Sequence, residues 1–275
     1  MKYPAKALMS VALLAGALGH QVASADQLAD VKARGTLVCG VLGAFEPFGY
    51  TDPASRAVVG YDVDICSAIA RRLGVKAEIK PVSIEARIPE LQQGRMDLLA
   101  AGLGYSAARA EQVDFSHGYY VSEHKLSVRA DKGYAKRDDL AGKRVSFTKG
   151  GITEGFVKSS VPTAVMVGFE DTPTAFTALA QGKVDAFSVS EVVARRLIGK
   201  LGANASQFKV VDPAVGKETW GLGVKKGEAG MLKSVNDALQ AMEASGEAQE
   251  IFDKWVGAKS TYETKRSFKI EPIKG

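Results

Sequence analysis

A seven-residue segment occurs twice in this chain in nearly the same form. Residues 91–97 read LQQGRMD and residues 179–185 read LAQGKVD. Each copy predicts the last turn of a helix, a glycine at its C-terminus and an aspartate that opens an apolar strand. Coincidence is the alternative, because such junctions are common. A true repeat predicts two similar α/β lobes, and a cleft between such lobes is a usual place for a small ligand.

Predicted strands and helices alternate along most of the chain, which indicates an α/β fold with parallel-rich sheets. We expect strands at 36–41, 76–82, 96–101, 126–129, 144–148, 165–168, 184–189, 208–211 and 220–224, and helices at 61–73, 87–93, 153–158, 174–181, 191–201, 231–244 and 248–256. The second unit is expected at 122–217. Lobe 1 would then combine 26–121 with 218–275, and the two crossings of the chain would form a two-stranded hinge.

The N-terminal segment has the pattern of a secretory signal peptide. Lys2 and Lys6 precede an apolar run at 7–19, which is too short to span a bilayer, and an A-x-A site follows at 23–25. We therefore expect residues 1–25 to be removed, leaving Asp26 first. No cysteine follows the run, so the expectation is a free periplasmic protein.

Charge and cysteine content exclude several classes of protein. The 36 Lys and Arg residues are scattered among 31 Asp and Glu, which disfavours a nucleic-acid surface. Cys39 lies in a predicted strand and Cys66 on the apolar face of the next helix, so we expect two buried thiols, with a disulfide as the alternative. Neither cysteine stands near a histidine at metal-ligand spacing, so we expect no metal and no cofactor.

Four motifs, in order along the chain, resemble one known family. Residues 60–70, GYDVDICSAIA, resemble the signature of periplasmic binding proteins for polar amino acids. Residues 45–48 (FEPF), 106–116 (SAARAEQVDFS) and 251–255 (IFDKW) resemble its other conserved segments. The chain is therefore identified as a member of bacterial extracellular solute-binding protein family 3. The resemblance implies the type II periplasmic-binding-protein fold, with two lobes that close over an amino acid for an ABC importer.

The resemblance also implies ligand contacts in lobe 1. In the family, an arginine at the position of Arg109 pairs with the ligand α-carboxylate, for which a planar guanidinium fork is suited. Ser106 would add a hydroxyl donor, cap its helix, or do both. Gly102 and Gly104 stand where the family often has Ser, Thr or backbone donors, and here only their backbone groups can contribute. Phe45 would lie against the ligand, with an ordinary core position as the alternative.

Arg87 is a second candidate. It lies in the sequence EARIP at 85–89. A similar Arg-Ile-Pro occurs in relatives that resemble glutamate and aspartate receptors, where the arginine can reach the side-chain carboxylate of the ligand. A surface arginine at the start of a helix is the alternative.

Lobe 2 departs from the family pattern. Relatives usually have Gly-Thr-Thr where this chain has GGIT at 150–153, so Gly151 would offer its backbone N–H and Thr153 would replace part of the lost hydroxyls.

A second departure in lobe 2 concerns the ligand ammonium. Relatives place an aspartate that binds this ammonium at the position of Ser190, which is neutral. A buried ammonium without an anion is costly. Either another acid serves or the ligand has no free ammonium. The candidate acids are Glu154, Glu191 and Glu218.

The resemblance and the two arginines together predict the receptor of an amino-acid ABC importer, a monomer that docks transiently on a membrane permease and performs no reaction. The positive site favours glutamate, aspartate or a related acid. One alternative is an enzyme similar to cyclohexadienyl dehydratases, which act on a prephenate-like diacid; Glu154 or Glu191 would then be the proton donor. Another is a ligand sensor that docks on a membrane receptor.

Overall fold

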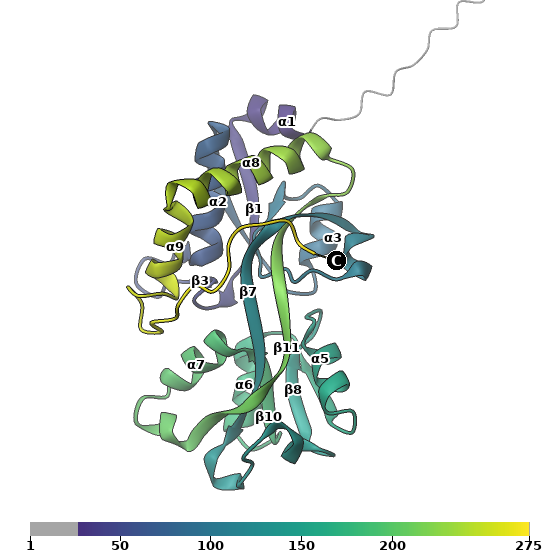
Figure 1. Cartoon of the computed structure of the whole chain (residues 1–275), viewed down its shortest axis with the longest axis vertical. Helices are drawn as coiled ribbons and strands as arrows, with labels where there is room; N and C mark the ends of the chain where they lie inside the picture. Colours follow the sequence, from purple (N-terminus) through teal and green to yellow (C-terminus); the bar gives the residue numbers. More distant parts are fainter. Residues whose placement is uncertain (1–26, 275) are drawn as a thin grey trace, which may run out of the picture.

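The computed structural model describes residues 27–274, which form two lobes joined by a pair of long strands (Figure 1). Both lobes are α/β, as the alternation of predicted elements indicated. The expected signal peptide at 1–25 lies outside the described residues. Within 27–274, no helix is long and apolar enough to cross a membrane.

Lobe 1 is the upper part of Figure 1 and contains both ends of the described chain. Its helices are α1 (Gln27–Arg34), α2 (Tyr61–Leu73), α3 (Arg87–Gln92), α4 (Ala107–Ala110), α8 (Ala229–Ser245) and α9 (Glu247–Trp255). Its strands are β1 (Thr36–Leu42), β2 (Ala44–Phe45), β3 (Gly49–Thr51), β4 (Val58–Val59), β5 (Lys76–Val82) and β6 (Leu98–Leu99). Ile65 and Ile69, on the apolar face of α2, are fully buried in the largest apolar core of the described chain.

Lobe 2 is smaller and repeats the α/β arrangement. It contains β8 (Arg144–Thr148), α5 (Thr153–Ser160), β9 (Val165–Phe169), α6 (Thr172–Ala180), β10 (Ala186–Ser190) and α7 (Glu191–Gly199). Short 3₁₀ turns occupy Ala130–Lys132, Arg137–Leu140 and Gly202–Gln207. A separate apolar cluster that includes Leu126, Val145 and Val157 stabilises this lobe.

The hinge consists of β7 (Val113–Arg129) and β11 (Phe208–Lys225), which run antiparallel through both lobes. They lie in the middle of one eight-stranded sheet with the order β5-β1-β6-β11-β7-β10-β8-β9. The outer strands on each side are parallel to one another, so the two predicted parallel-rich sheets are joined through the hinge strands. The pairing of β7 with β11 shifts register between Val211 and Gly216 and again near Gly221.

The two copies of the repeated segment have the same structure. Gly94 and Gly182 both have a φ of 70°, and each follows the end of a helix. The carboxylate of Asp97 accepts the backbone N–H of Val38 at 2.8 Å, and that of Asp185 accepts the N–H of Arg144 at 2.9 Å. Each aspartate therefore forms a hydrogen bond with the backbone near the start of the neighbouring parallel strand, which is β1 for Asp97 and β8 for Asp185. Coincidence does not account for this shared arrangement.

The expectation of two separate buried thiols is wrong. Cys39 in β1 and Cys66 in α2 form a disulfide, with their Cα atoms 6.5 Å apart. Both side chains are fully buried. The apolar surroundings that suggested thiols are equally compatible with a buried disulfide, because α2 packs directly on the sheet at β1.

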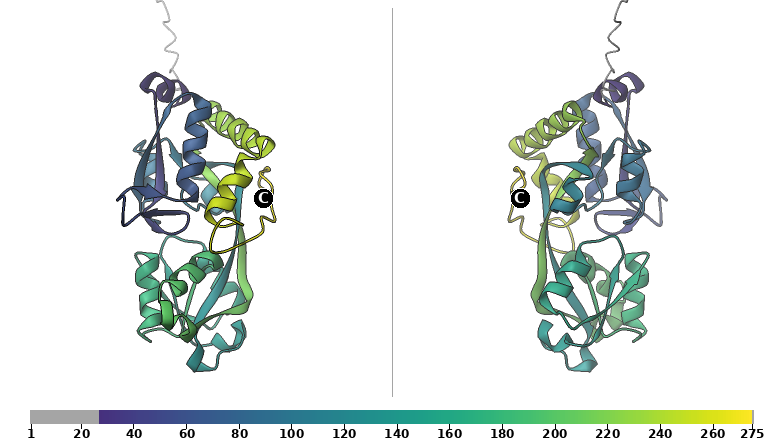
Figure 2. Two further views of the ribbon diagram at one scale, coloured as in Figure 1. Left: turned by 90° about the vertical axis from the view of Figure 1, so that its left-hand side faces the viewer. Right: turned by 90° about the vertical axis from the view of Figure 1, so that its right-hand side faces the viewer.

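The segment after α9 runs back along lobe 1 beside the hinge (Figure 2). The guanidinium of Arg266 forms an ion pair with Glu243 of α8, and the backbone N–H of Gly118 donates to the carbonyl of Glu271 at 2.8 Å. Phe268 packs edge-on against Tyr120 of β7. The C-terminal segment is thus attached to the lobe-1 part of the hinge.

Candidate functional site

A small cavity of about 30 Å³ lies between the lobes against the middle of the hinge. It has room for one or two water molecules. A larger hollow of about 390 Å³ opens beside it and shares four lining residues with it. Residues from both lobes and both hinge strands line the small cavity: Leu42, Phe45, Ile84, Arg87, Gly102, Arg109, His124, Thr148, Gly151, Ile152, Thr153, Thr172, Ser188, Val189, Glu218 and Trp220.

Arg109 enters the cavity from α4, a single helical turn in lobe 1. Ser106 is the N-cap of this turn, and its hydroxyl oxygen accepts the backbone N–H of Arg109 at 3.3 Å. The guanidinium donates through Nη1 to the carbonyl of Gly104 at 2.8 Å and through Nη2 to the carbonyl of Gly150 at 2.9 Å. Burial lowers the pKa of Arg109, while the Glu218 carboxylate partly offsets this. The side chain thus connects the two lobes.

Arg87, the first residue of α3, is almost fully buried, with 3% of its surface exposed. Its Nη1 donates to the carbonyls of Ala101 at 2.7 Å and Gly102 at 3.3 Å, while its Nε has no hydrogen-bond partner among the described residues. Burial, and then the nearby charge of Arg109, lower the pKa of Arg87 to about 9. A buried cation with an unused donor favours an anion beside it.

Asp62 stabilises the backbone segment at Ala101 and Gly102, whose carbonyls accept hydrogen bonds from Arg87. Its carboxylate accepts the hydroxyl of Tyr119 at 2.8 Å and the backbone N–H of Gly102 at 3.1 Å. Burial raises the pKa of Asp62 to about 7, although these two donors and Arg87 act in the opposite direction. The first acid of the motif at 60–70 therefore supports the cavity wall from behind.

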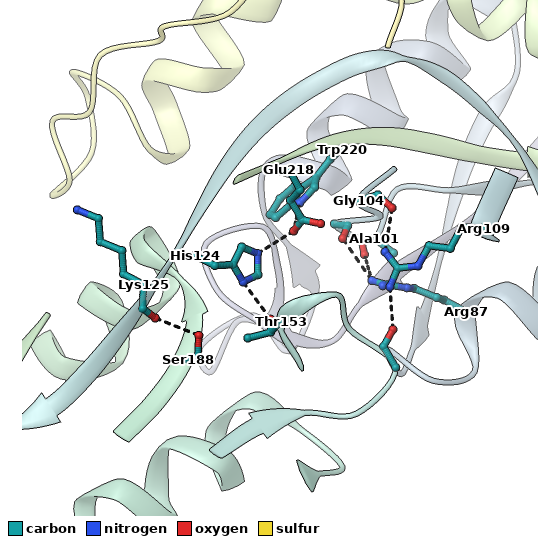
Figure 3. A network of polar contacts seen from close by, with 12 residues as sticks. Arg87, Ala101, Gly104, Arg109, His124, Lys125, Thr153, Ser188, Glu218 and Trp220 are labelled. Atoms are coloured by element: carbon teal, nitrogen blue, oxygen red, sulfur yellow. Dashed lines mark hydrogen bonds and ion pairs between the residues drawn. The ribbon is translucent and has the colours of Figure 1, made fainter. Parts of the chain in front are cut away.

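Glu218, on β11, is at the centre of a buried polar chain (Figure 3). Its Oε1 accepts from the Trp220 indole N–H at 2.7 Å and lies 2.8 Å from Nε2 of His124. The other ring nitrogen of His124 lies 2.9 Å from the Thr153 hydroxyl in lobe 2. Burial opposes ionisation of Glu218, but His124, the indole and Arg109 outweigh it and lower the pKa. Glu218 is therefore an anion in the cleft.

Aromatic rings form one wall of the cavity. Phe45 is 7% exposed, and its ring centroid lies 6.1 Å from that of Trp220. Trp220 in turn packs on Phe48 and Tyr120, with centroid distances of 4.6 and 4.7 Å. Packed aromatics of this kind exclude water and so strengthen the charge interactions beside them.

Comparison with known proteins identifies the chain. Residues 37–258 match the model for bacterial extracellular solute-binding proteins, family 3. The chain belongs to this family. The L-cystine-binding protein TcyJ of Escherichia coli (strain K12) is 31% identical over 256 residues, which cover 92% of this chain and 95% of the relative.

Two further matches cover similar lengths. The L-glutamate/L-aspartate-binding protein of Pseudomonas aeruginosa is 30% identical over 271 residues, covering 91% of this chain and 87% of the relative. The structure of an ancestral arginine-binding protein bound to arginine has a TM-score of 0.75 and 35% identity, covering 82% of this chain and 99% of that one. The fold is that of the two-lobed periplasmic binding proteins.

The solute-binding protein brings six of the nine sequence-predicted site residues into one cavity: Phe45, Arg87, Gly102, Arg109, Gly151 and Thr153. Gly104 contributes its carbonyl to Arg109, and Ser106 caps α4. Ser190 lies elsewhere. It is buried at the start of α7 and lines a different hollow, together with Tyr120 and Tyr262.

His124 and Trp220 were not predicted as site residues from the sequence, and Glu218 had no priority over the other candidate acids. All three belong to the hinge strands, near the positions where the chain was expected to cross between lobes. That expected crossing is the signal that could have found them, because strands that pass between two lobes form the floor of the cleft.

Proposed function

We propose that this protein is the receptor of an amino-acid ABC importer, which binds a polar amino acid between its lobes and presents it to a membrane permease. Membership of the solute-binding family and the amino-acid names of its relatives support this. These relatives are named for different amino acids, so the ligand of this chain depends on its own site residues.

We propose an acidic amino acid as the ligand. The described cavity lining contains two arginines, Arg87 and Arg109, and one carboxylate, Glu218, so it has an excess of positive charge. Glutamate or aspartate, with one net negative charge, would offset this excess. The unused Nε of the buried Arg87 is the observation that carries this proposal. A neutral amino acid would leave this excess positive charge buried and the Nε of Arg87 without an acceptor, which is unfavourable.

We propose that the chain is divided into two lobes at the two points where it was expected to pass from one lobe to the other. Residues 1–25 are a cleavable signal peptide and the mature protein is periplasmic. Lobe 1 comprises 26–121 and 218–275, and lobe 2 comprises 122–217. The protein acts as a monomer and contacts the permease transiently.

Binding without a reaction is also part of the proposal. Two acids could have served as the proton donor of a dehydratase, and neither lines the cavity. Glu154 forms an exposed ion pair with Lys158, and Glu191 pairs with Lys125 and Arg195. Glu218 does line it, but its lowered pKa disfavours a role as a proton donor at neutral pH.

A calorimetric screen of the purified protein against the twenty amino acids and simple dicarboxylates tests the ligand class. We expect glutamate or aspartate to bind most tightly. The variant Arg87→Met should weaken glutamate by at least about 30-fold and glutamine by far less. Binding of only basic or apolar amino acids would refute the acidic assignment, and turnover of prephenate would refute the absence of a reaction.

A further inference from the structure

Ser190 cannot supply an anion, and it does not line the cavity between the arginines and the hinge. We propose that Glu218 binds the ligand α-ammonium through its Oε2 atom, and that Gly104 is a glycine so that this carboxylate fits. This inference rests on the proposed function, because it requires a ligand with an α-amino group.

The two oxygens of Glu218 have different environments. Oε1 is satisfied by the Trp220 indole and by His124. Oε2 is buried and has no hydrogen-bond partner among the described residues. The side chain as a whole is only 5% exposed, and Figure 3 shows it between His124 on one side and Arg87 and Arg109 on the other. A buried carboxylate oxygen without a donor is a site for a cationic group.

Gly104 provides a second, independent observation. A Cβ atom built on this residue would lie 1.6 Å from Oε2 of Glu218. The carboxylate therefore occupies the space that a side chain at position 104 would need. One hinge carboxylate thus fills the space beside Gly104 and lines the cavity that Ser190 does not reach.

The placement of the charges suits an α-amino acid. Arg109 donates to the carbonyl of Gly104, and Oε2 of Glu218 lies over the same residue. The carboxylate and the ammonium of an amino acid are attached to one carbon, so their partners must also lie close together. A cation and an anion grouped around Gly104 meet this requirement.

Other acids near the site are already engaged. Glu154 and Glu191 are held in ion pairs with Lys158 and with Lys125 and Arg195. Both oxygens of Asp62 accept hydrogen bonds from Tyr119 and Gly102. Among the acids weighed from the sequence, Glu218 alone lines the cavity.

The test compares a ligand with and without its ammonium group. Calorimetry would measure glutamate and glutarate, its analogue that lacks the amino group, on the wild-type protein and on Glu218→Gln. We expect the variant to bind glutamate about 100-fold more weakly, with glutarate affinity unchanged or higher, because the exchange removes an anion that repels this dianion. Retained glutarate binding also shows that the variant is folded. Glu154→Gln, the same exchange at an exposed acid outside the cavity, should leave both affinities unchanged.

Equal loss of both ligands would overturn the proposal and make Glu218 a structural residue, as would full glutamate affinity in the variant. If the screen identifies a different amino acid, the same comparison is made with that amino acid and its deaminated analogue. The proposal of an acidic ligand would then fail, while this comparison would still test whether Glu218 binds the ligand ammonium. If no amino acid binds, both fail together.

Discussion

The guanidinium of Arg109 in lobe 1 donates to the carbonyl oxygen of Gly150 in lobe 2 at 2.9 Å. The same side chain is also expected to bind the ligand carboxylate. Arg109 therefore both lines the cavity and contacts lobe 2 across it. We expect its contribution to ligand binding to depend on lobe closure. A second contact across the cleft, from Arg196 of α7 to Glu46 of lobe 1 at 2.6 Å, lies away from the cavity lining.

Two variants of Arg109 distinguish the contribution of its positive charge to ligand binding from that of its planar guanidinium. Arg109→Ala should weaken binding of the ligand by at least about 100-fold, because a buried charge pair is lost. Arg109→Lys keeps the charge but not the two-pronged donor, and should recover only part of the affinity. Calorimetry on both variants measures this. Full affinity in Arg109→Ala would remove this residue from the site.

The contact between Gly104 and Glu218 predicts non-additive stability. Gly104→Ala should destabilise the protein by about 1–3 kcal/mol, because the new methyl group displaces a buried carboxylate. In a Glu218→Ala background, the same exchange should cost much less, since the space is free. Urea unfolding of the four proteins gives the coupling energy. Equal costs in both backgrounds would show that the two residues do not compete for space.

The disulfide between Cys39 and Cys66 should contribute about 3 kcal/mol to the free energy of unfolding, because it restricts the unfolded chain. The double variant Cys39→Ala, Cys66→Ala should lose this amount in urea unfolding. Adding a reductant should destabilise the wild-type protein and leave the double variant unchanged. An identical unfolding midpoint for the wild-type protein with and without reductant would contradict the prediction.

Asp62 should make stability fall as pH rises. Its pKa is raised to about 7 in the folded protein from an ordinary value of 3.8, so between these values the folded state holds a proton that the unfolded state has released. Its contribution is therefore most favourable near pH 4 and is lost by about pH 7. Asp62→Asn, which cannot ionise, should gain stability relative to the wild-type protein over this range, by up to a few kcal/mol. Urea unfolding at pH 4.5, 5.5 and 7 measures the difference, and a constant difference would refute it.

Much of the fold was predictable from local patterns. The helix at 61–73 and the strand at 76–82 were predicted with their observed bounds, because each has clear periodicity and a glycine or polar boundary. The hinge strands were predicted only as fragments. Pro213 and several glycines interrupt the apolar pattern of β11, and pairing with β7 over most of its length stabilises residues that do not signal a strand by themselves. Helix α1 was missed because its one buried apolar residue is Val31.

The site was predictable to a different extent. Arg87 and Arg109 were found because each lies in a short motif. The series of polar contacts from Thr153 through His124 to Glu218 was not predicted. These contacts join residues 29 and 94 positions apart, and they depend on a strand pairing that no local sequence pattern contains. The disulfide was missed for a similar reason, since burial explains a cysteine equally well with or without a partner.

The two hinge strands are continuous through both lobes, and Glu218 lies on β11 between the register shift at Val211–Gly216 and the two that follow Trp220. A residue at the axis of a closing motion travels little, while the far edges of the lobes travel most. Because Arg87, Arg109 and Glu218 belong to lobe 1 and the hinge, we expect them to meet the ligand before lobe 2 closes, whereas the contact of Arg109 with Gly150 forms only on closure. Changes on lobe 1 and the hinge should act on the rate of capture, and changes at Gly151 or Thr153 on the time for which the ligand is retained.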